Sequence, residues 1–302
     1  MKCLLNKKFY ALKEIPKYKL YTTSKIFSHL NEPNILKNII GYDFVPNIIS
    51  SFQDYDNIYI ITTYYEGKPL NYFKMYNLTE NQIQFASACV IQALTYLREK
   101  KIIHRDIMMK NIVMDKDNYF NVIDFSFSIK YKDKNNKKIY LNTYDMVSPP
   151  EMLNFSNYDY NSDYYRLGSI IYFLIFKTYP LITKREKNIT DIVIDHNLIK
   201  NYSENCIDFM NKLIKTDIKK RIGYFDINEL KNHPWFSTFN WEKLKRRQIN
   251  SPFEFIPNNN QKECFKIKDS LNHVIRFKKH SKEIFYKRLM EKFTFINAKV
   301  IN

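Results

Sequence analysis

The chain has 302 residues, of which 45% are hydrophobic and 16% aromatic, so it can bury the core of one large domain or of two lobes. This composition excludes a chain that is disordered throughout. The formal net charge is +17, but the lysines are spread along the whole length, so charge alone does not indicate nucleic-acid binding.

The cysteines and the apolar runs indicate the compartment. The four cysteines are far apart and show no CxxC spacing, which is typical of free thiols in a reducing compartment: Cys3, Cys89, Cys206 and Cys264. The first residues hold too short an apolar stretch for a signal peptide, and the longest apolar run, residues 169–176, is too short to cross a bilayer. We therefore expect a soluble, cytoplasmic protein.

The first third of the sequence alternates short strand-like runs with one helical stretch. Residues 8–15 and 57–65 have the composition of strands, and residues 21–40 between them include a helical pattern. The sequence Glu-Gly-Lys-Pro at residues 66–69 then interrupts the pattern, as a hinge would. These features predict a small sheet with one helix, followed by a boundary.

Helical patterns dominate the remainder of the chain. Apolar residues at steps of three and four predict an amphipathic helix: Ile83, Ala86, Val90, Leu94 and Leu97. Residues 111–114 and 120–123 form two apolar runs around a polar turn, which predicts a β-hairpin. Residues 163–176 are apolar on nearly all sides, so we expect a helix buried within a domain.

Polar motifs stand at both outer ends of the predicted hairpin. The segment that begins His104-Arg105-Asp106 ends at Asn111, and Asp124-Phe-Ser follows the hairpin. This arrangement resembles the H-R-D-L-x-x-x-N and D-F-G motifs of protein kinases, with the intervening length of that family. Phosphoryl transfer requires an aligned nucleophile and phosphates neutralised by metal, and the two ends of a hairpin can bring such groups to one cleft.

The resemblance to protein kinases implies a role for each of these side chains. Asp106 would orient the substrate hydroxyl or accept its proton, while Asn111 and Asp124 would hold Mg²⁺ against the phosphates of ATP. Taken singly, the three residues could equally be turn, capping or strand-end groups. Their occurrence together favours the functional interpretation.

A second resemblance lies in the first third of the chain. Residues 9–13, Phe-Tyr-Ala-Leu-Lys, resemble the V-A-I-K strand of kinases, which implies that Lys13 contacts the nucleotide phosphates. On its own Lys13 would be an ordinary strand lysine. Residues 30–36 resemble the helix-to-sheet passage of the AGC group of kinases, which makes Glu32 the expected ion-pair partner; Pro33 beside it suits only the first turn of a helix.

The same resemblance implies where ATP would bind. Residues 62–65 would form the gatekeeper and the hinge, with Thr63 and Tyr65 as candidate contacts. Ala11 and Val113 would form the apolar roof and floor of the adenine site. The alternative is that these residues are simply part of the core.

Further segments resemble structural motifs of kinases. Residues 148–151 resemble A-P-E, in which the glutamate pairs with a later arginine, here Arg221. Residues 163–168 resemble D-x-W-S-L-G, and residues 233–236, His-Pro-Trp-Phe, would close the helical lobe. Beyond them, residues 239–253 resemble the tail of AGC kinases, in particular of the YANK branch.

The expected fold is therefore α+β and bilobal. The kinase domain would span residues 1–236, with a small sheet lobe at 1–64 and a mainly helical lobe at 67–236. Residues 237–302 would form a basic AGC-like tail that wraps the lobes, within which residues 274–293 could form an amphipathic helix.

Three features depart from the kinase pattern. Only eight residues precede the lysine strand, so the first strand and its G-x-G-x-x-G loop are missing, through true loss or an incomplete sequence, and phosphate positioning should weaken. Met108 stands where serine/threonine kinases place a lysine, and Lys110 could supply the lost charge as the arginine of tyrosine kinases does. Ser126 replaces the glycine of D-F-G, which reduces backbone freedom. The activation segment, residues 127–148, has no clear phosphorylation site of the usual AGC kind, although Thr143 is available.

Three functions remain as hypotheses. The first is a serine/threonine kinase that uses ATP and Mg²⁺ on a protein substrate, and the second is a pseudokinase that acts as a binding or scaffolding module. The third, membrane or nucleic-acid contact through the basic tail, draws on charge alone, and we expect no specific nucleic-acid partner. The oligomeric state is open.

Overall fold

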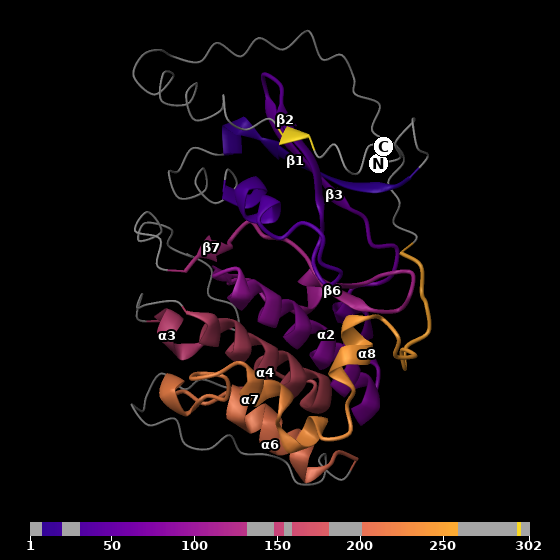
Figure 1. Cartoon of the computed structure of the whole chain (residues 1–302), viewed down its shortest axis with the longest axis vertical. Helices are drawn as coiled ribbons and strands as arrows, with labels where there is room; N and C mark the ends of the chain where they lie inside the picture. Colours follow the sequence, from indigo (N-terminus) through magenta and orange to yellow (C-terminus); the bar gives the residue numbers. More distant parts are fainter. Residues whose placement is uncertain are drawn as a thin grey trace.

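The computed structural model describes residues 8–19, 31–131, 148–153, 159–180, 201–258 and 295–296. Within these ranges the chain forms a sheet lobe and a helical lobe, the upper and lower halves of Figure 1. Part of the predicted N-terminal helix, residues 21–30, lies outside the described residues, as do Thr143 and the helix predicted at 274–293.

The sheet lobe contains four antiparallel strands in the order β1-β3-β2-β8. The strands are β1 (Tyr10–Pro16), β2 (Ile48–Gln53), β3 (Asn57–Thr63) and β8 (Phe295–Ile296). Pairing of β1 with β3 places Lys13 opposite Ile60. A helical segment, residues 31–37, contributes Ile35 and Leu36 to the same buried core as Ile60. The sheet therefore holds Lys13 in a fixed register beside this helix.

The helical lobe is built around two long helices. The described helical elements are η2 (Leu70–Met75), α2 (Glu80–Glu99), α3 (Pro150–Leu153), α4 (Tyr160–Phe176), α6 (Glu204–Leu213), η5 (Ile218–Lys220), α7 (Asn228–Lys231), η6 (Pro234–Phe236) and α8 (Trp241–Lys245). Helix α2 begins with a capping box, in which the Thr79 and Gln82 side chains accept each other's backbone N–H groups. Its apolar stripe is buried, as the sequence periodicity predicts.

Helix α4 runs through the centre of this lobe, as the sequence predicts. Most of its residues are buried, because α2 and α6 pack against it. Gly168 permits the close approach of α6: a Cβ atom there would lie 2.6 Å from Cβ of Leu213 and 2.7 Å from Cγ2 of Ile214. The helix ends at Lys177, whose left-handed backbone (φ 59°) terminates it.

Two short strand pairs lie between the sheet and the helices. Strands β5 (Ile112–Met114) and β6 (Phe120–Val122) form the predicted hairpin, and β4 (Ile102–Ile103) pairs with β7 (Ile129–Lys130). A 3-10 turn, η3 (Met109–Asn111), leads directly into β5. The two pairs bring the ends of the polar motifs at 104–111 and 124–126 together.

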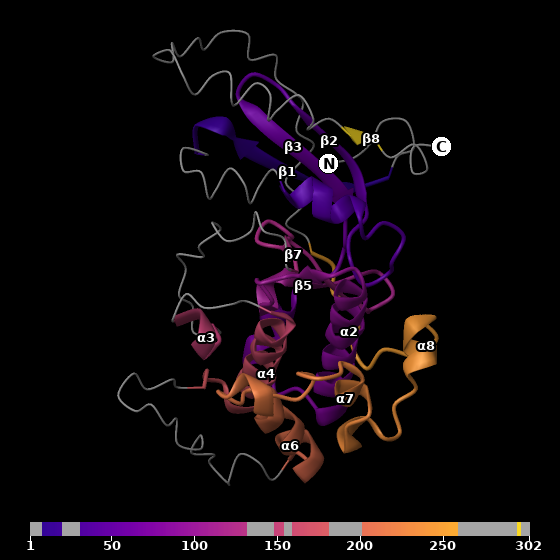
Figure 2. The same cartoon turned by 60° about the vertical axis from the view of Figure 1, so that its left-hand side comes forward.

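The chain after residue 236 contacts both lobes. Helix α8 lies beside α2 in Figures 1 and 2, and the two are in contact. Farther along, Pro257 forms a β-bridge with Gly67, and the N–H of Asn258 donates to the carbonyl of Glu66 (2.8 Å). Strand β8 then pairs with β2. The segment thus reaches the hinge and the sheet.

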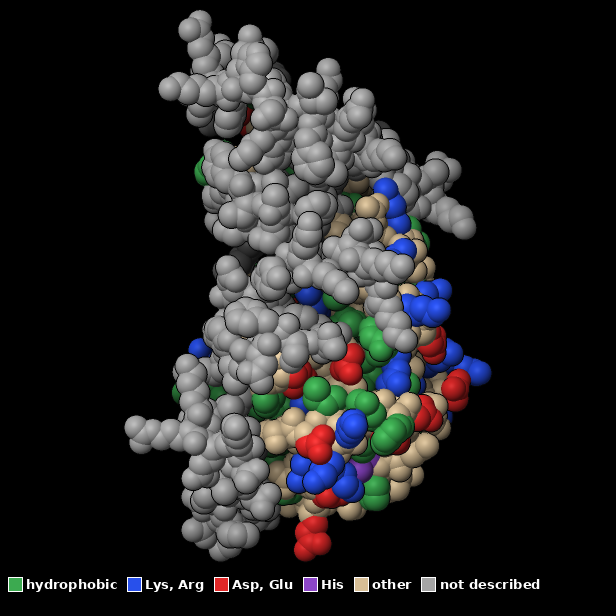
Figure 3. Space-filling model, turned by 90° about the vertical axis from the view of Figure 1, so that its left-hand side faces the viewer, with side chains coloured by type: hydrophobic (Ala, Val, Ile, Leu, Met, Phe, Trp, Pro, Cys, Tyr) green, Lys and Arg blue, Asp and Glu red, His purple; other side chains and the backbone are tan. Residues whose placement is uncertain are grey.

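The described surface shows no single dominant charge on the face drawn in Figure 3. Lysine and arginine side chains there are interspersed with aspartate and glutamate. Among the described helices, none is long and apolar enough to cross a membrane. Of the four cysteines, Cys89 and Cys206 are described, and both are buried free thiols.

Candidate active site

A cavity of about 370 Å³ opens between strands β1 and β3 on one side and the β5–β6 hairpin on the other. This volume is in the usual range for a small-molecule site. All eight residues predicted to bind nucleotide or metal line it: Ala11, Lys13, Glu32, Thr63, Tyr65, Asn111, Val113 and Asp124. The fold therefore gathers into one cavity residues that are up to 113 positions apart, from Ala11 to Asp124.

Lys13 lies between two carboxylates. Its Nζ donates to Glu32 Oε2 (2.8 Å) and Oε1 (3.1 Å), and to Asp124 Oδ1 (2.8 Å). Partial burial of Lys13 opposes its charged form, but the two carboxylates outweigh this effect and raise its pKa. The lysine is therefore held as a cation at the wall of the cavity, joining the sheet, the helical segment and the hairpin.

Asp124 is ionised and adopts an uncommon backbone conformation. Burial opposes its ionisation, but the Lys13 ammonium and the Ser126 hydroxyl hold its pKa well below the usual range. Its φ angle is 65°, in the left-handed region, which aspartate tolerates better than most residues. Such conformations concentrate at functional sites because the surrounding structure must hold them.

Asp106 and Asn111 form a second pair next to the cavity. The Asn111 Nδ2 group donates to Asp106 Oδ2 (2.8 Å) and to the Asp106 backbone carbonyl (3.0 Å), so these bonds join the end of η3 to Asp106. Burial raises the pKa of Asp106, while the nearby charges of Arg166 and Lys110 act in the opposite direction. A carboxylate with a raised pKa is better suited to accept a proton near neutral pH.

The segment 104–106 is held by a buried aspartate of helix α4. Asp163 accepts the backbone N–H groups of His104 and Arg105, both at 2.8 Å. Burial raises the pKa of Asp163 to about 6. The His104 ring packs edge-on against Phe125, with centroids 4.7 Å apart, and burial lowers its pKa to about 4. The two motifs at the ends of the hairpin are thus in contact with each other.

The remaining predicted residues lie around this centre. Lys110 is exposed on η3, and its charge reaches Asp106, whereas Met108 carries no charge. The Thr63 hydroxyl accepts the N–H of Asn47 (3.1 Å), so this side chain is already bonded to the neighbouring backbone. Val113 forms a β-bridge with Pro69.

The predicted structural pair of the helical lobe is also formed. Arg221 Nη1 donates to Glu151 Oε1 (2.8 Å) and Nη2 donates to Oε2 (3.1 Å), and the two side chains are 0% and 5% exposed. Ser162 also donates to Glu151, and Arg221 to the Asn161 carbonyl. A buried bidentate pair of this kind links α3, α4 and the segment after α6.

The oxygen atoms of the site suit a hard divalent cation. Asn111 and Asp124 both line the cavity, and their oxygens Oδ1 and Oδ2, respectively, accept no hydrogen bond from any described residue. Amide and carboxylate oxygens are the donors that Mg²⁺ prefers. The residues therefore fit a magnesium ion.

Two contributions to the site were not predicted from the sequence. The Ser126 hydroxyl donates to Asp124 Oδ1 (2.6 Å), although the sequence indicated only a loss of backbone freedom there. Asn258 lines the cavity because the tail bonds to the hinge. No local pattern marks Asn258, since its position depends on a contact between distant segments.

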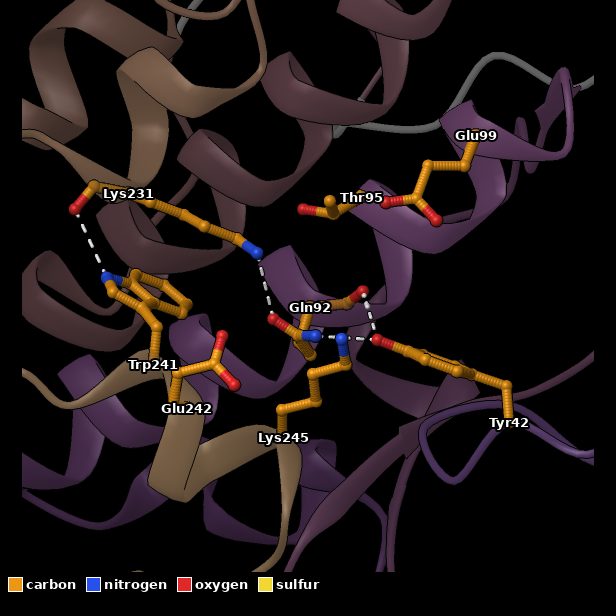
Figure 4. A pocket seen from close by; sticks show the side chains of 8 residues that line it. All are labelled: Tyr42, Gln92, Thr95, Glu99, Lys231, Trp241, Glu242 and Lys245. Carbon is orange, nitrogen blue, oxygen red and sulfur yellow. Dashed lines mark hydrogen bonds between the residues drawn. The ribbon is translucent and has the colours of Figure 1, made fainter.

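A second cavity, of about 100 Å³, lies on the outer side of α2, away from these groups. Figure 4 shows that its side chains bond to each other: Lys231 Nζ donates to Gln92 Oε1 (3.0 Å), and Gln92 Nε2 donates to the Tyr42 hydroxyl (2.6 Å). Trp241 Nε1 donates to the Lys231 carbonyl (3.1 Å). These contacts fasten α7 and α8 to α2, which is a structural role.

Comparisons with known proteins point to one family. A family model described as the protein kinase domain matches residues 1–236. The serine/threonine-protein kinase sgk-1 of Caenorhabditis elegans is 28% identical over 253 residues, which cover 82% of this chain and 54% of that protein. The cAMP-dependent protein kinase type 3 of Saccharomyces cerevisiae is 28% identical over 255 residues, which cover 82% of this chain and 63% of that protein.

A third relative has a higher identity over a shorter stretch. The developmentally-regulated protein kinase 1 of Dictyostelium discoideum is 32% identical over 233 residues, which cover 75% of this chain and 32% of that protein. The chain thus spans less than two thirds of the length of each of these three relatives.

Proposed function

Because this chain belongs to the protein kinase domain family, we propose that it is a serine/threonine kinase that transfers the γ-phosphate of ATP to a hydroxyl group of a protein substrate. The α+β bilobal fold and the likeness to AGC kinases that the sequence predicted are confirmed. The observation that carries the proposal is the joint contact of Lys13 with Glu32 and Asp124 at the wall of the cavity.

Each polar group has a part in the proposed reaction. The substrate hydroxyl oxygen would attack the γ-phosphorus while its proton passes to Asp106, which Asn111 orients through the 2.8 Å bond. ADP would leave as the phosphorus–oxygen bond to it breaks. Lys13, fixed by Glu32, would bind the phosphates. Lys110 would add positive charge near Asp106, where Met108 cannot.

The metal is part of the same proposal. Mg²⁺ held by Asn111 and Asp124 would neutralise phosphate charge. The Asp124 carboxylate is ionised and thus ready to bind a cation, because Lys13 holds its pKa low. The adenine would lie against Ala11 and Val113, near Thr63 and Tyr65 of the hinge.

We also propose the coarser organisation of the protein. The sheet lobe would span residues 1–64, the helical lobe 67–236 and the tail 237–302, and the protein would work in the cytoplasm on a protein substrate. On the face drawn in Figure 3, the described basic side chains are interspersed with acidic ones, and most of the basic tail after residue 258 lies outside the described residues, so membrane contact through this tail stays a prediction. A pseudokinase is not favoured, since a scaffold would not need Lys13, Asp106, Asn111 and Asp124 at one cleft.

Phosphate transfer from radiolabelled ATP to a general protein substrate tests the proposal. We expect wild-type protein to label the substrate only when Mg²⁺ is present. Asp106→Asn should lower the rate at least about 100-fold while nucleotide still binds. Asp117→Asn is the matched control, because Asp117 is exposed on the turn of the hairpin. Equal rates for wild type and Asp106→Asn would exclude the proposed role of Asp106.

A further inference from the structure

The Asp124 carboxylate uses its two oxygens differently. Oδ1 accepts three hydrogens, from Lys13 Nζ (2.8 Å), from the Ser126 hydroxyl (2.6 Å) and from the Ser126 backbone N–H (3.4 Å). The other oxygen, Oδ2, accepts none from the described residues. The rotation of the carboxylate is therefore fixed by a lysine on one side and a serine on the other.

Ser126 suits this role in this conformation. It is 3% exposed, so its hydroxyl has no competition from bulk water for the bond to Asp124. The φ angle of Ser126 is negative, so a side chain at this position causes no backbone strain. The cost in backbone freedom that the sequence indicated is thus accompanied by a charge-assisted hydrogen bond.

A glycine at this position would supply no hydroxyl. Asp124 would then keep only the bond from Lys13, which is itself shared with Glu32, and the long bond from the backbone N–H of residue 126 (3.4 Å). Side chains that hydrogen-bond a metal ligand from behind orient that ligand and tune its affinity. The serine therefore adds a second, buried hydrogen bond to the Asp124 carboxylate. The surrounding structure must hold Asp124 in place, because its backbone φ of 65° is unfavourable.

We propose that the Ser126 hydroxyl is a positioning residue that holds Asp124 with Oδ1 bonded to the protein and Oδ2 presented to the metal. This inference rests on the proposed function, because it assigns how the same site binds Mg²⁺. Ser126 itself touches neither substrate nor metal. The Ser126 hydroxyl holds the Asp124 carboxylate in its metal-binding orientation before the nucleotide binds.

The test is a magnesium titration of nucleotide binding with the full chain. A fluorescent, non-hydrolysable ATP analogue is bound at a series of Mg²⁺ concentrations and in EDTA. Ser126→Ala removes only the hydroxyl, and Ser126→Gly removes the whole side chain. For both variants we expect the Mg²⁺ concentration at half-saturation to rise about 10-fold, while affinity for the analogue in EDTA is unchanged.

Ser128→Ala is the matched control. Ser128 is also buried in this segment, but its hydroxyl donates to the His104 carbonyl (3.2 Å) and not to Asp124. We expect its magnesium titration to match that of the wild type. Ser126→Thr, which keeps the hydroxyl, should restore most of the magnesium response.

Two results would overturn the inference. One is a Ser126→Ala titration identical to that of the wild type. The other is an equal loss of affinity with magnesium and in EDTA, which would mean a general structural role. Neither result depends on phosphate transfer, so a wild-type protein that binds magnesium and nucleotide as expected but transfers no phosphate would contradict the proposed function alone.

Discussion

The two halves of the active site are held in different ways. In the helical lobe, the segment 104–106 is fixed by backbone bonds to a buried aspartate, and the lobe below it is fastened by the Arg221–Glu151 pair. In the sheet lobe, the Lys13 ammonium bonds, among the described residues, to the side chains of Glu32 and Asp124, and both Lys13 and Asp124 are about one third exposed. The segment 104–106 is thus part of the core, whereas Lys13, Glu32 and Asp124 come together from three separate segments.

This difference separates stability from activity. Changes beneath the catalytic loop should unfold the protein, because they leave charges buried without partners. Changes at Lys13 and its partners should leave the fold intact and alter nucleotide binding and transfer, because Lys13 and Asp124 are about one third exposed and the three groups lie on separate elements.

The largest expected effect is at Arg221. Arg221→Met would leave the Glu151 carboxylate buried without its guanidinium partner, which should lower the free energy of unfolding by about 3–5 kcal/mol. Urea denaturation measures this change. The double variant Arg221→Met/Glu151→Met should recover much of the loss, because neither charge of this pair then remains in the core. If Arg221→Met lowered the free energy of unfolding by less than about 1 kcal/mol, the buried pair would not stabilise the helical lobe as we expect.

The second expected effect is on the pH dependence of stability. Burial lowers the pKa of His104 from 6.5 to about 4 in the folded protein. Between these two pH values, His104 is therefore protonated in the unfolded chain and neutral in the folded protein. Stability should therefore decline as pH falls from about 6.5 towards about 4, by on the order of 3 kcal/mol from this group. Urea midpoints of wild type and His104→Gln across this range should converge at low pH. Parallel curves would show that His104 is not buried neutral.

The third effect sharpens the sheet-lobe side of the comparison. Glu32→Gln removes one of the two charges that hold Lys13, so kcat/KM for transfer should fall by about 100-fold because the lysine is misplaced. The free energy of unfolding should change little. Glu14→Gln is the control, because Glu14 is exposed and lies on β1, the strand that carries Lys13. A large loss of stability with unchanged transfer would reverse the assignment.

The smallest effect is expected at Lys110. Lys110→Met would remove the exposed charge that we propose compensates for Met108, so transfer should slow by about 10-fold without a change in stability. Lys116→Met, exposed on the turn of the hairpin, is the control. Transfer at the wild-type rate in Lys110→Met would remove Lys110 from the site.

Much of the fold and of the candidate site could be predicted because the signals are local. The spacing of the motifs at 104–111 and 124–126 requires a hairpin between them, and the apolar residues of α2 and α4 mark their burial. Pro33 did not prevent Glu32 from reaching Lys13, because the helical segment 31–37 places the proline near the beginning of its described part.

The unpredicted features depend on side-chain rotamers, on contacts between distant segments or on very short strands. The partner of a serine hydroxyl is set by side-chain rotamers, so the bond from Ser126 to Asp124 could not be inferred from a motif position. The arrival of Asn258 at the cavity depends on the bridge between Pro257 and Gly67, residues almost 200 positions apart. The short pair β4–β7 has too few residues to give a strand pattern.

The most direct measurement is a crystal structure of the full chain with Mg²⁺ and a non-hydrolysable ATP analogue. We expect the phosphates beside Lys13, the metal bound by oxygens of Asn111 and Asp124, and Asp106 next to the terminal phosphate. A nucleotide bound outside the cavity, or Lys13, Asp106, Asn111 and Asp124 separated from one another, would contradict the assignment of this site.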